Sequence, residues 1–352
     1  MIIKRPDWTK QKERNKSKVW IDKNENSDVS LGRVNLSNLR KLDINNIFAY
    51  PDLGKLYLLL SKHLKINYKN LLLTNGADGA IKLVFDSLKN KKNLKILRFE
   101  PSFAMYKIYS KVYSQKECVI NYKKTENEPR LNHSEILKKI KIFKPHLILL
   151  ANPNSPTGTI LKKKELAEII KVSKKINTLV LLDEAYFPYS NFSFINKVNL
   201  FENLIVVRSL KAFGLSGLRV GYLVANRKLI EIIGSLRPLY EINSVGAYLF
   251  FQLLKNYFKV KKSVQNLINS KNYFIRELKK RNIEYIKGFG NFTHIKLKKN
   301  KRLILNIISK KLYIRENESH TSLSGFSRIS FTTKKNYQFI LNAIDKFSNA
   351  KK

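Results

Sequence analysis

The alternation of short apolar runs with longer amphipathic stretches through the middle of the chain restricts its fold more than any other feature. The apolar runs are bounded by polar or turn-forming residues, which is typical of buried strands. We expect strands at Leu71–Thr74, Leu94–Phe99, Leu147–Ala151, Leu179–Leu182, Leu204–Val207 and Val220–Ala225. Apolar residues recur at three- and four-residue spacing in the stretches expected as helices, which are Gly79–Leu88, Ser134–Phe143 and Lys163–Ile176. This pattern predicts an α/β fold in which helices cover both faces of a mostly parallel sheet.

The pattern changes after residue 245. A long amphipathic segment, Gly246 to Arg281, is followed by short strand-like runs at Ile283–Ile286, Asn291–Leu297, Ile314–Arg315 and Arg328–Phe331. We therefore expect a large domain over residues 41–245 and a smaller α+β domain over residues 246–352, preceded by an N-terminal arm over residues 1–40.

The composition of the chain restricts the kinds of partner it can bind and the cellular compartment we expect for it. The chain has 352 residues, 43% of them hydrophobic, enough for a large and a small domain. Its formal net charge of +42 is carried by lysines spread along the whole length, without zinc-ligand spacing or an isolated basic arm, so we expect no nucleic-acid partner. The single cysteine, Cys118, excludes an intrachain disulfide and fits a reducing compartment. No run reaches membrane-spanning length, and Met1 to Lys18 lacks the apolar core of a signal peptide, so we expect a cytoplasmic protein.

The loop Ser209 to Arg219 carries the most specific chemistry of the chain. Lys211 precedes Arg219 in this loop, which also contains Gly214 and Gly217. A lysine amine can form an imine with an aldehyde cofactor, and a guanidinium can bind its phosphate in two-pronged fashion. The five histidines show no metal-ligand spacing with one another or with Cys118, so we expect no metal.

Three further segments follow apolar runs, at the edge of a parallel sheet where ligand sites gather. Asp183 and Tyr186 follow one run, the turn Ala151 to Gly158 follows another, and Asn75–Gly79 runs into a helix. Backbone N–H groups at a helix start can bind an anion, and a glycine lets the anion approach.

Together these segments resemble the pyridoxal-phosphate (PLP) enzymes of aminotransferase fold type I, most closely the histidinol-phosphate aminotransferases. The resemblance runs from Asn24–Glu25–Asn26 to Ser327–Arg328–Ile329–Ser330, and it implies a homodimer whose N-terminal arm packs with the C-terminal domain. It also implies a Schiff base on Lys211, a contact of Asp183 with the pyridine nitrogen and a hydrogen bond from Tyr186 to the phenolate oxygen.

The remaining roles implied by the resemblance concern the cofactor's phosphate, its ring and the substrate. The phosphate would be bound by Tyr50 of the other subunit and by five residues of the same subunit, which are Ala77, Asp78, Gly79, Ser209 and Arg219. Phe103 and Ser155 would contact the cofactor ring. The substrate would be bound by Asn24, Arg315 and Arg328.

The chain departs from the family pattern at several positions. No serine stands directly before Lys211, Ser155 replaces a common asparagine, Gly79 replaces a glutamate and Ala49 replaces an arginine. Three activities stay open at this point. The chain could be an aminotransferase that moves an amino group from an amino-acid donor to an oxo acceptor, which could be phosphorylated. It could be a PLP-dependent decarboxylase of an amino-acid phosphate. It could also be a catalytically degenerate protein of this fold that binds a partner or nucleic acid.

Overall fold

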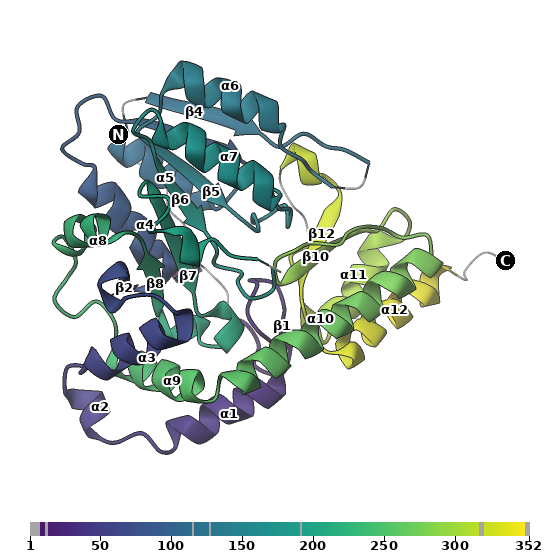
Figure 1. Cartoon of the computed structure of the whole chain (residues 1–352). Coiled ribbons are helices and arrows are strands. Elements are labelled where there is room, and N and C mark those ends of the chain that lie inside the picture. Colours follow the sequence, from purple (N-terminus) through teal and green to yellow (C-terminus); the bar gives the residue numbers. More distant parts are fainter. Residues whose placement is uncertain are drawn as a thin grey trace.

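A seven-stranded sheet forms the centre of the protein in a computed structural model that describes residues 8–10, 13–114, 116–126, 128–190, 192–316 and 320–348 (Figure 1). Its strands lie in the order β2-β8-β7-β6-β5-β3-β4. Their bounds are β2 Leu71–Thr74, β3 Lys95–Glu100, β4 Lys116–Asn121, β5 Leu147–Ala151, β6 Leu179–Asp183, β7 Leu204–Ser209 and β8 Gly221–Val224. Strands β4, β3, β5, β6 and β7 pair in parallel, and β8 is antiparallel to both β7 and β2. The predicted mostly parallel sheet is confirmed.

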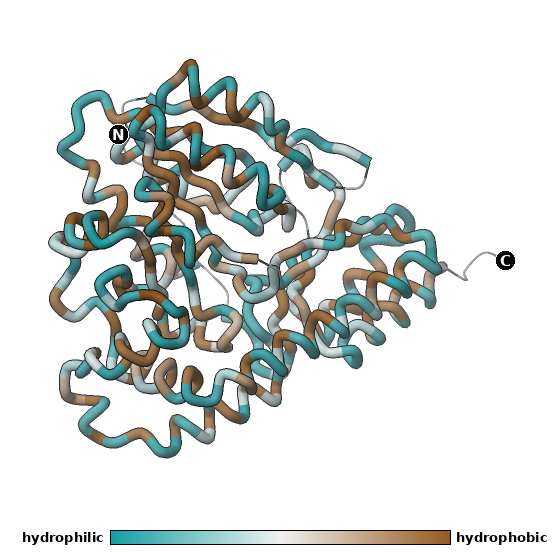
Figure 2. The backbone as a smooth tube through the Cα atoms, in the orientation of Figure 1, coloured by the Kyte–Doolittle hydropathy of each residue, from teal (hydrophilic) through white to brown (hydrophobic). Residues whose placement is uncertain are grey.

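Both faces of this sheet are buried, which is why its strands are almost continuously apolar (Figure 2). Successive side chains of a strand point to opposite faces, so in β6 Val180 and Leu182 enter one core while Leu181 enters the other. The first core is completed by α1 Val29–Leu39, α3 Gly54–Leu64, α6 His133–Phe143, α7 Lys163–Lys174, α9 Ser244–Lys255 and the first half of α10 Tyr257–Lys280. The second is completed by α4 Gly76–Ser87, α5 Ala104–Tyr113 and α8 Arg227–Gly234.

Several elements differ from those expected. Strand β4 and helices α1, α3, α5 and α8 were not predicted. The short helix α2 Asn45–Phe48 was not predicted either. The segment Gly246 to Arg281, expected as one amphipathic stretch, forms two helices that part at Asn256, whose backbone angles (φ −115°, ψ 38°) leave the helical region.

A second, smaller sheet packs beside α10, α11 Lys301–Ser309 and α12 Lys334–Ser348. It has the order β12-β10-β9, with β9 Glu284–Ile286, β10 Phe292–Lys296 and β12 Phe326–Ser330, all antiparallel. The N-terminal segment joins this part, because β1 Val19–Trp20 pairs with β11 Leu312–Tyr313 and Ile21 is buried in the same core.

The division at residues 40 and 245 stays a prediction, and both ends of the chain lie partly outside the described residues. The cores divide the chain within α10. Val264 and Leu267 pack with the large sheet, whereas Phe274 and Leu278 pack with the small one, and the intervening Lys271 is buried where the two cores meet.

Candidate active site

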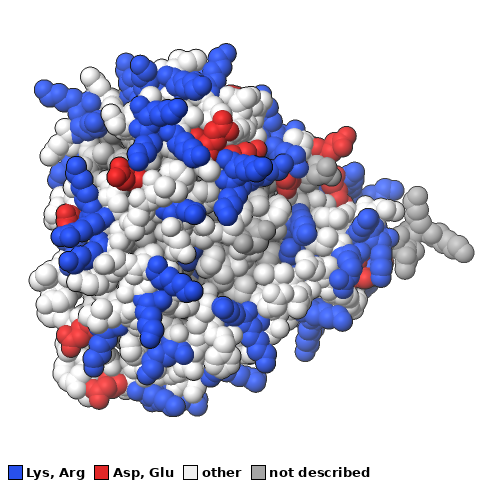
Figure 3. All heavy atoms as spheres, in the orientation of Figure 1, with Lys and Arg blue, Asp and Glu red and all other residues white. Residues whose placement is uncertain are grey.

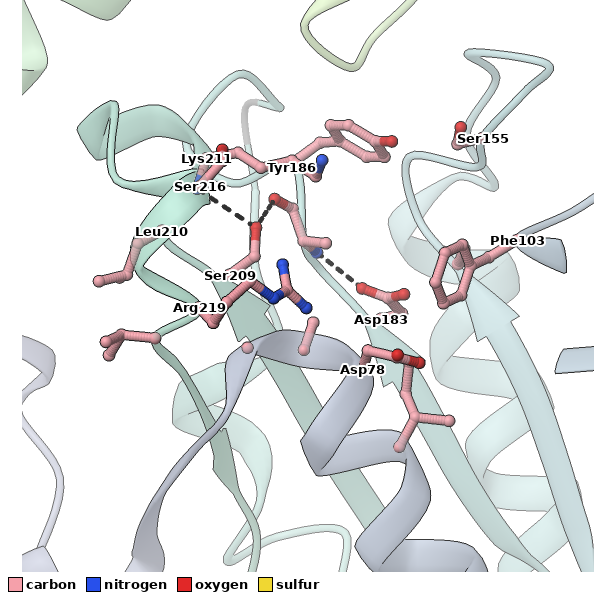
Figure 4. A pocket seen from close by; sticks show the side chains of 16 residues that line it. Asp78, Phe103, Ser155, Asp183, Tyr186, Ser209, Leu210, Lys211, Ser216 and Arg219 are labelled. Carbon is pink, nitrogen blue, oxygen red and sulfur yellow. Dashed lines mark hydrogen bonds between the residues drawn. The ribbon is translucent and has the colours of Figure 1, made fainter. Parts of the chain in front are cut away.

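A pocket opens at the edge of the large sheet where β2, β3, β5, β6 and β7 end (Figure 4). Its wall brings together residues from five separate parts of the sequence. It is lined by Gly76, Ala77, Asp78, Ile81, Phe103, Ala151, Ser155, Asp183, Ala185, Tyr186, Ser209, Leu210, Lys211, Ser216, Arg219 and Val220. Most of the residues expected to bind a cofactor are among them.

Lys211 stands at the start of the 3-10 turn η4 (Lys211–Phe213), directly beyond the end of β7. Its Nζ lies 5.9 Å from the centre of the Tyr186 ring. A buried ion pair fastens this end of β7 to β6, since Arg208 Nη2 lies 2.9 Å from Glu184 Oε2. Removing one partner of such a pair is costly, so this contact fixes the strand end from which Lys211 projects.

Asp183 ends β6 and is only 6% exposed. Its Oδ1 accepts a hydrogen bond from the backbone N–H of Ala185, and its Oδ2 accepts one from the hydroxyl of Tyr106, both at 2.8 Å. Burial raises the pKa of Asp183, while these two hydrogen bonds and the charge of Lys211 act in the opposite direction. The carboxylate is therefore held in one orientation within a largely dry site.

Arg219 and the first turn of α4 form the opposite end of the pocket. Arg219 has a positive φ of 54° and Gly76 one of 69°, a region that costs a non-glycine residue backbone strain. Gly221 lets β8 approach this turn, because a Cβ there would lie 2.5 Å from the carbonyl carbon of Gly76. Helix α4 begins at Gly76, so Ala77 and Asp78 face the pocket, whereas Gly79, expected to bind phosphate, does not line it.

Tyr186, Phe103 and Ser155 line the remaining wall. Figure 4 shows Phe103 and Ser155 on one side of the pocket, with Lys211, Ser209 and Arg219 on the other. The hydroxyl of Tyr186 accepts a hydrogen bond of 3.0 Å from Nδ2 of Asn24.

Asn24 does not itself line the pocket but is buried beside it. Its backbone N–H donates to Ser330 Oγ at 2.9 Å, and its carbonyl accepts from Asn291 Nδ2 at 2.7 Å. The Asn24 side-chain oxygen is buried with no hydrogen-bond partner among the described residues. A buried acceptor of this kind is available to a ligand.

Arg315 and Arg328 lie outside the pocket wall but directly opposite each other. The two residues exchange backbone hydrogen bonds of 3.0 and 2.8 Å, which places their side chains on the same face. The Arg328 guanidinium lies 5.4 Å from the centre of the Phe292 ring, and that ring contacts Tyr186 edge-on at 5.4 Å. The arginine pair is thus connected to the pocket through two aromatic rings.

Tyr50 is not in the pocket of its own chain. It follows α2, is 74% exposed and stacks on Tyr240 with 4.0 Å between ring centres. It belongs to a separate surface hollow that Arg219 also lines.

Sequence reasoning missed two polar residues of this region. Tyr106 was passed over, although its position three residues after Phe103 would place both on one face of a helix. Ser216 lines the pocket, and its hydroxyl is buried without a hydrogen-bond partner among the described residues. Only the folded loop shows that this hydroxyl lies near Lys211.

No helix in the described part of the chain is long and apolar enough to cross a bilayer. No group of three or more histidine, cysteine, aspartate or glutamate side chains among these residues could hold a metal ion.

Comparisons with known proteins show the family of this chain. The family model for aminotransferases of class I and II matches residues 17–344. The histidinol-phosphate aminotransferase of Caldanaerobacter subterraneus is 30% identical over 312 residues, which is 88% of this chain and 87% of that protein.

Two solved structures show the shared fold. The histidinol-phosphate aminotransferase from Clostridium acetobutylicum superposes with a TM-score of 0.78 at 22% identity, over 94% of this chain and 99% of that one. The L-threonine-O-3-phosphate decarboxylase from Porphyromonas gingivalis superposes with a TM-score of 0.72 at 21% identity, over 90% and 96%. Because the family model covers nearly the whole sequence, this chain belongs to the aminotransferases of class I and II and is a pyridoxal-phosphate-dependent aminotransferase.

Proposed function

We propose that this enzyme transfers an amino group from an amino acid to a phosphorylated oxo acceptor, as the name of its relative in Caldanaerobacter implies for that protein. The observation that carries the proposal is the convergence of Lys211, Asp183 and Arg219 on one pocket. Lys211 and Arg219 come from the loop after β7 and Asp183 from the end of β6, and each has the chemistry that one part of PLP requires.

The pocket fits PLP. Arg219 lies so close to Gly76 that a Cβ on this glycine would be 3.0 Å from Nη2. The guanidinium and the first backbone N–H groups of α4 therefore lie side by side, and together they can bind a phosphate at the positive end of the helix. Asp183 offers a buried carboxylate for a protonated ring nitrogen, and Phe103 offers an aromatic face. Bound PLP supplies an aldehyde carbon for amines and a ring that accepts electron density.

The protein's own residues would then orient the substrate and move its proton. The Lys211 amine would hold the cofactor, and once a substrate amine displaces it, it would carry the proton at the substrate's Cα. Asp183 would keep a positive charge on the ring nitrogen through its fixed carboxylate. Asn24 would orient the Tyr186 hydroxyl, to which it already donates a hydrogen bond.

The arginine pair suggests an anionic substrate. Arg315 is exposed and Arg328 half-buried, and their guanidinium groups share a face of the small sheet. Two arginines on one face suit a phosphate or carboxylate, because each guanidinium can donate two parallel hydrogen bonds. The free Asn24 oxygen provides a further contact for the substrate.

The active unit in this proposal is a homodimer that shares its two sites. Several apolar side chains close to Tyr50 in sequence, or next to its stacking partner Tyr240, are exposed: Ile44, Ile47, Phe48 and Leu239 are each at least 67% exposed. Exposed apolar side chains gathered in one region are typical of a subunit interface. Tyr50 would then reach the partner's phosphate site.

We also propose a cytoplasmic location and no nucleic-acid partner. Lys and Arg are spread over the face seen in Figure 3 and do not gather in one groove. Such a distribution favours solubility and weak non-specific binding over a nucleic-acid site.

Borohydride reduction of the PLP-loaded enzyme, followed by peptide mapping, tests the assignment. We expect the label on Lys211 and none in Lys211→Ala protein, which should melt near the wild-type temperature. A label on another lysine would overturn the site. Incubation with an amino donor and a phosphorylated oxo acid should yield a new amine without CO₂ release; stoichiometric CO₂ would instead show a decarboxylase.

A further inference from the structure

We propose that Tyr106 is a positioning residue for this reaction. Its hydroxyl holds the Asp183 carboxylate toward the cofactor ring, and its own ring packs against Phe103, the residue that packs on the cofactor ring. This inference rests on the proposed roles of Asp183 and Phe103. Tyr106 itself does not line the pocket and would act through these two residues.

The contact between Tyr106 and Asp183 is short and buried. The hydroxyl lies 2.8 Å from Oδ2, and the exposed fractions of the two residues are 1% and 6%. Burial, followed by the charge of Asp183, raises the pKa of Tyr106 well above its usual value. The phenol therefore stays protonated and donates a hydrogen bond to the carboxylate. A hydrogen bond between a neutral donor and a buried carboxylate is stronger than a neutral pair.

The same tyrosine also fixes Phe103. Its backbone N–H donates to the carbonyl of Phe103 at 3.0 Å in the first turn of α5, and the two rings meet edge-on with 5.6 Å between centres at 89°. Phe103 is 37% exposed and lines the pocket. The Tyr106 side chain therefore contacts both a carboxylate and an aromatic ring of the pocket wall.

The hydroxyl has a second consequence, for the charge of Asp183. The groups acting on this carboxyl are Tyr106 from α5, the Ala185 N–H and Glu184 from the following turn, and Lys211 from η4. Burial raises the pKa of Asp183 and the Tyr106 hydrogen bond lowers it. Without the hydroxyl, Asp183 should take up a proton at a higher pH and lose its hold on a charged ring nitrogen there.

The chain offers a matched control. Tyr113 lies on the same helix and donates to Asp86 at 2.6 Å, away from the pocket. Tyr106→Phe and Tyr113→Phe therefore each remove one tyrosine–aspartate hydrogen bond while keeping the ring. With PLP as the probe, we expect Tyr106→Phe to raise the dissociation constant about tenfold and to move the acid limb of the binding curve to higher pH. Tyr113→Phe should stay within twofold of wild type.

A double-mutant cycle with Asp183→Asn separates positioning from general packing. If Tyr106 acts through the carboxylate, Tyr106→Phe should weaken PLP binding by less than twofold in the Asp183→Asn background. An equal loss in both backgrounds, or equal effects of the two tyrosine changes, would overturn the proposal.

Folding and function have separate readouts. If the Tyr106→Phe protein unfolds while the Tyr106→Phe, Asp183→Asn double variant folds, the difference in stability shows the coupling between the two residues. If both variants unfold, the role of Tyr106 is structural and the proposal is wrong. Wild-type protein that takes up no PLP would overturn the proposed function itself, and this inference with it.

Discussion

The guanidinium of Arg219 fills the space in which a side chain of Gly76 would begin, with Nη2 3.0 Å from the position of an ideal Cβ. The two residues are far apart in sequence, and each has a positive φ. The fold thus uses a strained arginine and a glycine to shape the end of the pocket assigned to phosphate.

Gly76→Ala should therefore weaken PLP binding by at least tenfold and lower the free energy of unfolding by about 1–2 kcal/mol, since alanine is disfavoured at positive φ. Equilibrium dialysis and urea unfolding would measure the two effects. Gly217→Ala is the control, because a Cβ at Gly217 would meet no atom within 4 Å. Equal effects of the two changes would exclude the Arg219 contact as the cause.

Asp183→Asn should keep PLP on the protein but slow the loss of the substrate's Cα proton by at least a hundredfold, because an amide cannot balance a positive charge on the ring nitrogen. Single-turnover absorbance with an amino donor would measure the rate. Asp86→Asn, at another carboxylate that accepts a hydrogen bond from a tyrosine, serves as the control and should react at the wild-type rate. A reduction below tenfold, about 1.4 kcal/mol, would remove Asp183 from this role.

Tyr50→Phe should weaken PLP retention, whereas Tyr68→Phe, at another exposed tyrosine, should not. Mixing Tyr50→Phe with Lys211→Ala protein should restore part of the activity. In a heterodimer of the two variants, one site combines the intact Lys211 of the first chain with the intact Tyr50 of the second. Light scattering would report the dimer, and labelled subunits would report their exchange. A fully active monomer, or proven exchange with no recovery, would exclude the shared site.

Arg328→Lys should raise the KM for a phosphorylated substrate about tenfold or more, because lysine cannot donate the paired hydrogen bonds of a guanidinium. The change should leave the PLP dissociation constant unaltered, since Arg328 lies outside the pocket wall. Arg302→Lys, on the exposed side of α11, is the matched control. A KM that is unchanged in Arg328→Lys would place the phosphate elsewhere.

Lys271 should make stability depend on pH. It is 6% exposed, and burial, with a smaller contribution from the charge of Lys287, lowers its pKa from 10.5 to about 8. The unfolded chain therefore holds a proton between pH 8 and 10.5 that the folded protein releases, so this residue lowers stability below pH 8 and the cost fades as the pH rises.

Lys271→Met should consequently increase the free energy of unfolding at pH 7 by roughly 2 kcal/mol, and the gain should shrink toward pH 10. Urea unfolding at several pH values would measure it. Lys262→Met, at an exposed position of the same helix, should show no such trend. A gain that is constant with pH would point to packing rather than to proton release.

The order of apolar runs was sufficient to predict the α/β sheet, because strands buried on both faces must be apolar throughout and stand out from amphipathic helices. Five predicted strands fall on β2, β3, β5, β6 and β7, and the sixth falls on β8, whose antiparallel direction the residues do not encode locally. Strand β4 was not predicted because it lies at the edge of the sheet and contains the polar residues Lys116, Glu117 and Asn121, so it has no continuous apolar run.

The site divides in the same way. Lys211, Asp183 and Arg219 were predicted as site residues from their neighbours in sequence, and the structure places all three in the wall of one pocket. Gly79 does not line this pocket, because α4 begins earlier, at Gly76, whose positive φ the sequence allows but does not specify; its contact with phosphate stays a prediction.

The sequence by itself determined the fold class and indicated the candidate reactive groups, because the hydrophobic period and the residues of each loop are local properties of the chain. Only the tertiary structure decided which groups touch. The hydrogen bond from Tyr106 to Asp183 joins residues 77 positions apart, and Arg315 meets Arg328 through an isolated bridge between the segment after β11 and strand β12. Such contacts depend on how helices and strands pack across long loops, and no spacing along the chain records that packing.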